Sequence, residues 1–119
     1  MKDTNILVFG DSITYGAFDY KSNGWVNRLR LALDDTEKSD FYTYNLGINS
    51  DATIDVLNRF ENECAARYIE NSNTIIIFAI GINDTVDQNG IDITTLKQFE
   101  INIIELIKKL NKLPIKYYF

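Results

Sequence analysis

The sequence predicts an α/β domain with three layers, in which helices cover both faces of a parallel sheet. Two observations lead to this prediction. Short apolar runs alternate along the chain with longer segments whose apolar residues recur every three or four positions, as strands and amphipathic helices do. The strongest run, Thr74–Ile80, is apolar at every position after its first residue, which is typical of a strand that is covered on both faces. Strands that alternate with helices in this way form parallel sheets.

The first half of the chain contains two predicted strands and one predicted helix. Ile6–Phe9 is a short apolar run that fits a buried strand. A helix follows, because apolar residues then recur at helical spacing, at Trp25, Val26, Leu29, Ala32 and Leu33. An acidic stretch, interpreted as a solvated loop, leads to a second strand at Phe41–Tyr44.

The second half repeats this alternation. A second helix is marked by an apolar stripe at Ile54, Leu57, Phe60, Cys64 and Tyr68. The strand at Thr74–Ile80 follows, and then a long third helix, for which Thr94 is the expected N-cap. The apolar stripe of that helix consists of Leu96, Phe99, Ile103, Leu106, Ile107 and Leu110. Pro114 interrupts the pattern, and a fourth strand is expected at Ile115–Phe119.

The resulting order, βαβαβαβ, predicts a flavodoxin-like three-layer α/β/α fold with right-handed crossovers and the strand order 2-1-3-4. A chain of 119 residues has room for one domain, so we expect a single domain over residues 1–119. A fourth strand normally leads into a further helix. We therefore expect the domain to be truncated after the fourth strand and incomplete at its C-terminus. An uncovered C-terminal strand would favour self-association through its exposed edge.

Composition and charge exclude several classes of protein. A net charge of -5 argues against a nucleic-acid duplex or an anionic membrane surface as a partner. No apolar run is long enough for a membrane span, and the run near the N-terminus is too short for a signal peptide. Cys64 is the single cysteine, which rules out an intrachain disulfide and suits a reducing compartment. We therefore expect a cytoplasmic protein.

Three polar motifs each follow a predicted strand. Because the carboxyl ends of parallel strands share one edge, and ligands bind there where the strand order reverses, we expect the motifs to converge. The motifs are Gly10-Asp11-Ser12, Asn45-Leu46-Gly47-Ile48-Asn49-Ser50 and Gly81-Ile82-Asn83-Asp84.

These motifs contain the groups that acyl transfer requires. Ser12 is a candidate nucleophile raised on a tight turn, with Gly10 permitting the bend. The backbone N–H groups of Ser12 and Gly47 and the side-chain amide of Asn83 are neutral hydrogen-bond donors. Aimed at one oxygen atom, these donors would form an oxyanion hole.

The segments ILVFGDSITYG at 6–16, NLGINSDAT at 45–53 and IIIFAIGINDT at 75–85 resemble the first three blocks of the SGNH hydrolases, also called GDSL esterases and lipases. The resemblance implies a serine ester hydrolase that acts on a small-molecule ester without a cofactor or metal. It implies that Ser12 is the nucleophile and that Gly47 and Asn83 are oxyanion donors. Asp11 and Asp84 are then supporting residues that orient the Ser12 turn and the Asn83 loop.

The sequence departs from the family pattern at three places. Ile13 replaces leucine, and Ser50 stands where a second glycine is common. The family's fourth block, an Asp-x-x-His segment, has no counterpart, and the 119 residues contain no histidine. Because the loss of the base in a catalytic triad costs about four to six orders of magnitude in turnover, we expect weak or no esterase activity from these residues alone.

Two other classes of function stay open. The missing histidine favours a non-catalytic pseudoenzyme or binding module that keeps the same pocket. Alternatively, Asp11 and Asp84 could hold Mg²⁺ for phosphoryl transfer. Phosphatase and receiver-type sites need a second acidic residue after the first strand, and Asp11 has no such partner.

Overall fold

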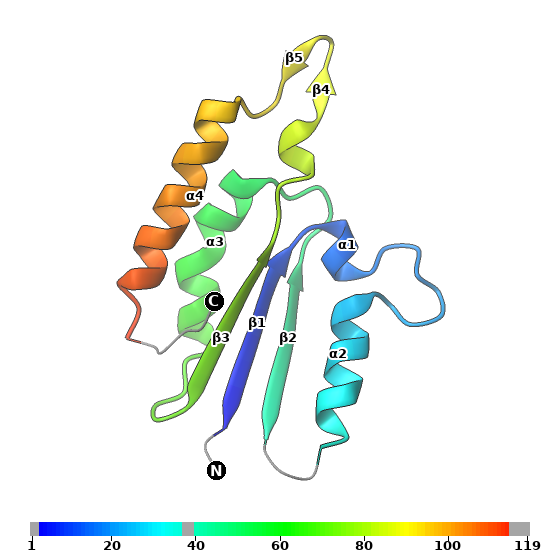
Figure 1. The fold of residues 1–119 in the computed structure, drawn as a ribbon, viewed down its shortest axis with the longest axis vertical. Coiled ribbons are helices and arrows are strands. Elements are labelled where there is room, and N and C mark those ends of the chain that lie inside the picture. Colours follow the sequence, from blue (N-terminus) through cyan, green and yellow to red (C-terminus); the bar gives the residue numbers. More distant parts are fainter. Residues whose placement is uncertain (1–2, 37–39, 115–119) are drawn as a thin grey trace.

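The computed structural model describes residues 3–36 and 40–114. Its main sheet has three parallel strands in the order β2-β1-β3, as predicted (Figure 1). The strands are β1 (Thr4–Gly10), β2 (Phe41–Gly47) and β3 (Asn73–Ala79), and the main helices are α2 (Trp25–Asp34), α3 (Thr53–Ala66) and α4 (Leu96–Asn111). The predicted α/β fold is therefore confirmed.

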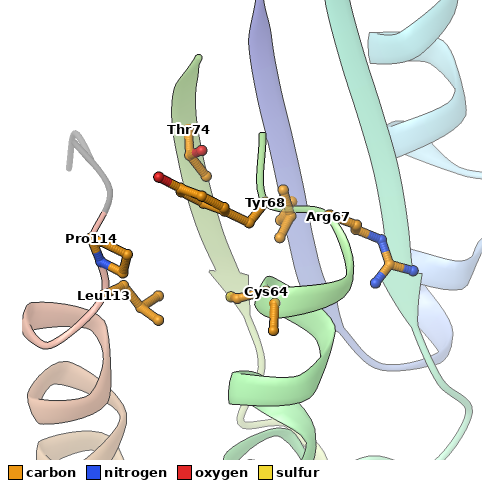
Figure 2. Close-up of a pocket in the computed structure, with 8 residues that line it drawn as sticks. Cys64, Arg67, Tyr68, Thr74, Leu113 and Pro114 are labelled. Carbon is orange, nitrogen blue, oxygen red and sulfur yellow. The ribbon is translucent and has the colours of Figure 1, made fainter. Parts of the chain in front are cut away.

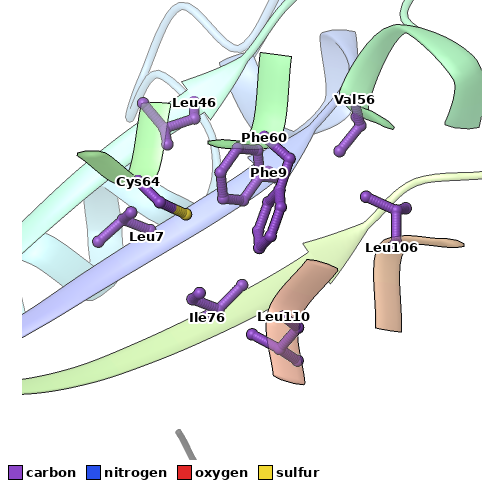
Figure 3. Packing of buried hydrophobic residues seen from close by; sticks show 9 residues of the cluster. All are labelled: Leu7, Phe9, Leu46, Val56, Phe60, Cys64, Ile76, Leu106 and Leu110. Carbon is purple, nitrogen blue, oxygen red and sulfur yellow. The ribbon is translucent and has the colours of Figure 1, made fainter. Parts of the chain in front are cut away.

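The central strand β1 determines the layers. All seven of its residues are buried, and successive side chains of a strand point to opposite faces of the sheet. Ile6 and Val8 pack with Val26 of α2 on one face. Leu7 and Phe9 belong to a larger core on the other face, beneath α3 and α4 (Figure 3). Helices therefore cover both faces, as the three-layer prediction requires.

The larger core holds α3 against the sheet. The rings of Phe9, Phe60 and Phe78 contact one another with centroids 5.2 to 5.7 Å apart, a range typical of favourable aromatic pairs. The buried members of this core, all shown in Figure 3, are Leu7, Phe9, Leu46, Val56, Phe60, Cys64, Ile76, Leu106 and Leu110. This packing fixes where α3 begins and therefore positions the loop between β2 and α3.

The third strand, β3, is less buried than the sequence predicted. Within the described residues β3 lies at the edge of the sheet, and Ile75 and Ile77 on it are half-buried rather than covered. The helices α3 and α4 cover one face of β3, whereas α2 packs chiefly beside β1 and β2. The predicted strand at Ile115–Phe119, and self-association through it, lie outside the described residues.

Two small elements near the strand ends were not predicted. A four-residue helix, α1 (Ser12–Tyr15), directly follows β1. A hairpin of β4 (Asp87–Gln88) and β5 (Ile91–Asp92) lies before α4. Its turn is Asn89-Gly90, with φ values of 57° and 78°. Asn-Gly is the preferred pair for this kind of turn, so this dipeptide could have predicted the hairpin.

The ends of the helices correct two further predictions. The N-cap of α4 is Thr95 rather than Thr94, because the Thr95 side chain accepts a hydrogen bond from the Gln98 backbone N–H at 3.1 Å. Tyr68 lies beyond the end of α3. In the part of the chain that the structure describes, no helix is long and apolar enough to cross a membrane.

Candidate active site

The three motifs leave the sheet at the same level. Gly10, the last residue of β1, pairs with Gly47 on one side and with Ala79 on the other. The chain then enters α1 after Gly10, the β2–α3 loop after Gly47, and the short turn η1 (Asn83–Thr85) soon after Ala79. All three segments lie at one end of the sheet (Figure 1). The register of the strands therefore brings the candidate residues to a common edge.

Ser12 begins α1 and is held by its neighbour. Asp11 is the N-cap of this short helix, is only 2% exposed, and its Oδ1 accepts a hydrogen bond from the Ile13 backbone N–H at 2.9 Å. Ser12 is half-buried, and within the described residues its hydroxyl makes no hydrogen bond. The turn is thus fixed by Asp11 while the hydroxyl stays available.

Two glycines let the turn pack tightly on the strand ends. We predicted that Gly10 is needed because its backbone can bend in ways that other residues cannot. This reason is wrong, because Gly10 does not have a left-handed φ. A Cβ atom at Gly10 would collide with the Thr14 side chain and lie 2.9 Å from the Ala79 carbonyl oxygen. A Cβ atom at Gly47 would collide with the backbone of α1. Both positions therefore need glycine for space, and Gly47 lies directly against the serine turn.

The N–H of Gly47 already has a hydrogen-bond partner. It donates to Oδ1 of Asn45 at 3.0 Å, and Nδ2 of Asn45 in turn donates to the Thr14 carbonyl at 2.8 Å. Asn45 therefore ties the end of β2 to α1. Asn45 opens the second motif, but this bracing role was not predicted from the sequence.

The side chain of Asn83 is oriented by the β2–α3 loop. Its Nδ2 donates to the backbone carbonyl of Asp51 at 2.9 Å. An amide nitrogen carries two hydrogens, so this contact leaves the second N–H for another acceptor. Asp51 is mostly buried, and burial raises the pKa of its carboxyl, while hydrogen bonds and charge from Arg59 act in the opposite direction.

The carboxylate of Asp84 serves a different purpose. It accepts hydrogen bonds from the backbone N–H of Thr53 at 3.0 Å and from the Thr53 hydroxyl at 2.6 Å. The same hydroxyl accepts a hydrogen bond from Nδ2 of Asn102 at 3.0 Å. Asp84 thus joins the Asn83 turn to the start of α3 and to α4 through a buried network.

The acidic residues of the motifs lie in separate turns. Asp11 caps α1, and Asp84 is bonded to Thr53. Among residues 3–36 and 40–114, no three side chains of histidine, cysteine, aspartate or glutamate gather in a way that could hold a metal ion.

Exposed apolar side chains adjoin the candidate residues in the sequence. An isoleucine is the direct neighbour of each of the three: Ile13 is 63% exposed, Ile48 is 46% exposed and Ile82 is 58% exposed. A cavity of about 370 Å³ lies on the α4 side of the Asn83 turn, and it is lined by Gly81, Asp84, Thr85, Asp92, Thr94, Leu96 and Phe99.

A second cavity, of about 250 Å³, lies where α3 and α4 end, away from these motifs (Figure 2). Its lining is mostly apolar and includes Cys64, Tyr68 and Leu113. Burial raises the pKa of the Cys64 thiol to about 12. Since the thiolate is the reactive form of cysteine, this cavity offers no activated nucleophile. Cys64 is a core residue, as predicted.

We expect Cys64 to resist alkylation in the folded protein. A rise of the pKa from 9.0 to about 12 lowers the thiolate fraction at pH 8 by about 1000-fold. Reaction with iodoacetamide at pH 8, followed by mass spectrometry with and without urea, measures this protection. Equal labelling rates in the two conditions would show that Cys64 is accessible in the folded state.

Comparisons with known proteins agree with this fold. A model of the GDSL-like lipase/acylhydrolase family matches residues 8–116. Similar solved structures include AlinE4, an SGNH-hydrolase family esterase (21% identity, TM-score 0.71, covering 98% of this chain and 58% of that one). TesA is 26% identical, with a TM-score of 0.72 over 95% of this chain and 57% of its own. A lipase/acylhydrolase from Enterococcus faecalis is 26% identical, with a TM-score of 0.64 over 98% of this chain and 56% of its own.

The chain spans less than three fifths of the length of these three solved structures. No curated protein sequence matches it significantly.

Proposed function

The chain belongs to the GDSL-like lipase/acylhydrolase family, and we propose that its residues supply the nucleophile and the oxyanion hole of a serine ester hydrolase. One observation carries this proposal: the strand register brings the segments that contain Ser12, Gly47 and Asn83 to one edge of the sheet. The hydroxyl of Ser12 makes no hydrogen bond within the described residues. A nucleophile and oxyanion donors are two of the three parts that acyl transfer needs on the enzyme side, and the third is a general base.

In the proposed reaction, Oγ of Ser12 attacks the carbonyl carbon of the ester while its proton passes to a general base, which later returns it to the leaving alcohol; these 119 residues offer no histidine for that role. The carbonyl electron pair moves onto the oxygen, and the resulting oxyanion accepts hydrogen bonds from the N–H groups of Ser12, Gly47 and Asn83. One such donor is typically worth about 3 to 4 kcal/mol of barrier. Collapse of the intermediate expels the alcohol and leaves an acyl-serine, which water then hydrolyses. During attack, the oxyanion competes with Oδ1 of Asn45 for the N–H of Gly47.

The exposed isoleucines favour esters that carry an apolar group beside the carbonyl. Ile13, Ile48 and Ile82 adjoin the three candidate residues in the sequence and are exposed, and an alkyl chain that contacted them would remove apolar surface from water. Short alkyl esters such as p-nitrophenyl butyrate are therefore suitable assay substrates.

The absence of histidine favours a second candidate function. No histidine occurs in the 119 residues, and without a general base Ser12 would be a weak nucleophile. A binding module that holds an ester or its acid in the same pocket, without turnover, would need the oxyanion donors but no base.

Covalent capture of Ser12 separates the two functions. A p-nitrophenyl alkylphosphonate forms a bond between phosphorus and the serine Oγ and releases p-nitrophenolate, and mass spectrometry locates the adduct. The 119-residue chain is treated, both alone and with imidazole added as an external base.

For the hydrolase we expect one adduct, on Ser12, that forms slowly in the chain alone and faster with imidazole. Saturable binding of butyrate without any adduct would instead support the binding module. An adduct on another serine would contradict the role of Ser12.

A further inference from the structure

One guanidinium group contacts two of the three segments that form the proposed site, and it reaches the third through Asp51. Arg59 lies on α3, and its Nη2 donates to the carbonyl of Leu46 at 2.7 Å and to the carbonyl of Gly10 at 3.3 Å. Its Nε donates to Oδ2 of Asp51 at 3.0 Å, and Nη2 lies 2.9 Å from the same oxygen. The guanidinium also stacks over the Phe9 ring, 5.5 Å from its centroid.

Each of these contacts acts on a group next to the proposed chemistry. The carbonyl of Leu46 and the N–H of Gly47 belong to one planar peptide and point in opposite directions. A hydrogen bond that fixes the Leu46 carbonyl therefore also fixes the direction of the Gly47 N–H. The contact with Gly10 holds the end of β1, directly before Asp11 and Ser12.

The third contact reaches Asn83 indirectly. Arg59 holds the carboxylate of Asp51, and the backbone carbonyl of Asp51 accepts the hydrogen bond that orients the amide of Asn83. Both charged side chains are largely shielded from water, at 16% exposed for Arg59 and 11% for Asp51. A shielded ion pair with several hydrogen bonds resists rearrangement far more than a surface pair does.

We propose that Arg59 is a positioning residue that sets the direction of both the Gly47 and the Asn83 donors. This role rests on the proposed function. It requires the planar fork of arginine, because the fork donates to two carbonyls and one carboxylate at fixed angles. Lysine would keep the charge but, as a point charge on a flexible stem, could not hold all three acceptors in this geometry.

The same helix provides a matched control. Arg67, at the other end of α3, is 25% exposed, pairs with Glu63 at 2.7 Å and stacks over the Tyr44 ring at 5.1 Å. It therefore resembles Arg59 in burial, charge partner and aromatic contact, but it contacts none of the site segments. Replacing each arginine by lysine separates positioning from general stability.

The first measurement is kinetic, with p-nitrophenyl butyrate as the substrate. For Arg59→Lys we expect kcat to fall by about 10- to 100-fold, because small displacements of catalytic groups have effects of this size, and KM to change much less. For Arg67→Lys we expect kcat to stay within about twofold of the parent, since Arg67 contacts none of the site segments and substitutions away from a site have small effects on catalysis. Equal kcat values in the two variants would overturn the role of Arg59.

The second measurement does not depend on activity. In ¹⁵N NMR spectra of the 119-residue chain, recorded below the unfolding temperature of each variant, we expect Arg59→Lys to shift the Gly47 amide and the Asn83 side-chain amide signals. Arg67→Lys should leave both signals in place.

If no protein in the series hydrolyses esters, the proposed function fails, yet these signals still decide the role of Arg59. Unchanged signals in Arg59→Lys would overturn it. Failure of both Arg59→Lys and Arg59→Gln to fold, while Arg67→Lys folds, would make Arg59 a stability residue and would overturn it too.

Discussion

If the proposed function holds, replacing Ser12 by alanine lowers ester hydrolysis by about 10⁴-fold or more, because removal of a serine nucleophile costs this much in other enzymes. The substitution removes a hydroxyl that makes no hydrogen bond within the described part of the chain, so the fold has little reason to change. Asp11 caps α1 through its own side chain and keeps this contact in the variant. The measurement is kcat/KM for p-nitrophenyl butyrate, together with the urea midpoint as a check on folding.

A second serine gives the matched control for this experiment. Ser22 lies in the loop between α1 and α2, and Ser22→Ala removes the same chemical group without touching the strand ends. We expect this variant to keep the parent activity within about twofold. If Ser12→Ala and Ser22→Ala retain equal activity, Ser12 is not the nucleophile, and any hydrolysis comes from another group. If the parent itself is inactive but binds butyrate, the binding module becomes the better description.

Much of the fold could be predicted because burial in a parallel sheet leaves a clear pattern in the sequence. The run around Ile75 and the alternation of strands with amphipathic helices were sufficient for the topology of the described sheet. Element ends were less predictable, since Thr94 and Thr95 are equally good caps by type. Only the direction of the chain at the start of α4 decides between them.

The site was predictable to the extent that it depends on topology. Motifs at the ends of parallel strands must meet, so Ser12, Gly47 and Asn83 could be placed on one edge from the order of the elements. The contacts that orient these groups could not be predicted in this way. Arg59 lies 12 positions beyond Gly47 in the sequence, and its hydrogen bonds depend on how far α3 reaches over the strand ends. Nor could the reason for Gly10 be read from the sequence, because the steric conflict is with Thr14 and Ala79 in three dimensions.

Replacing Asp84 by alanine is expected to lower the free energy of unfolding of the 119-residue chain by about 3 kcal/mol. Asp84 is buried, and its removal leaves the backbone N–H and the hydroxyl of Thr53 without their acceptor. Each buried donor that loses its partner costs about 1 to 3 kcal/mol. Thr53 is the first residue of α3, where a carboxylate also interacts favourably with the helix dipole. Urea unfolding monitored by circular dichroism gives the value directly.

The exposed Asp87 on β4 is the control, and Asp87→Ala should change the unfolding free energy by less than about 0.5 kcal/mol. Thr53→Val tests the coupling, because it removes the hydroxyl that links Asp84 to Asn102. Partners in one buried network do not contribute independently, so the loss in the double variant should be smaller than the sum of the two single losses. Two results would contradict this network: additive losses of unfolding free energy, or a loss in Asp84→Ala as small as that in Asp87→Ala. Either result would mean that the apolar core holds the Asn83 turn instead. The orientation of Asn83 would then depend on Asp51 and Arg59 alone.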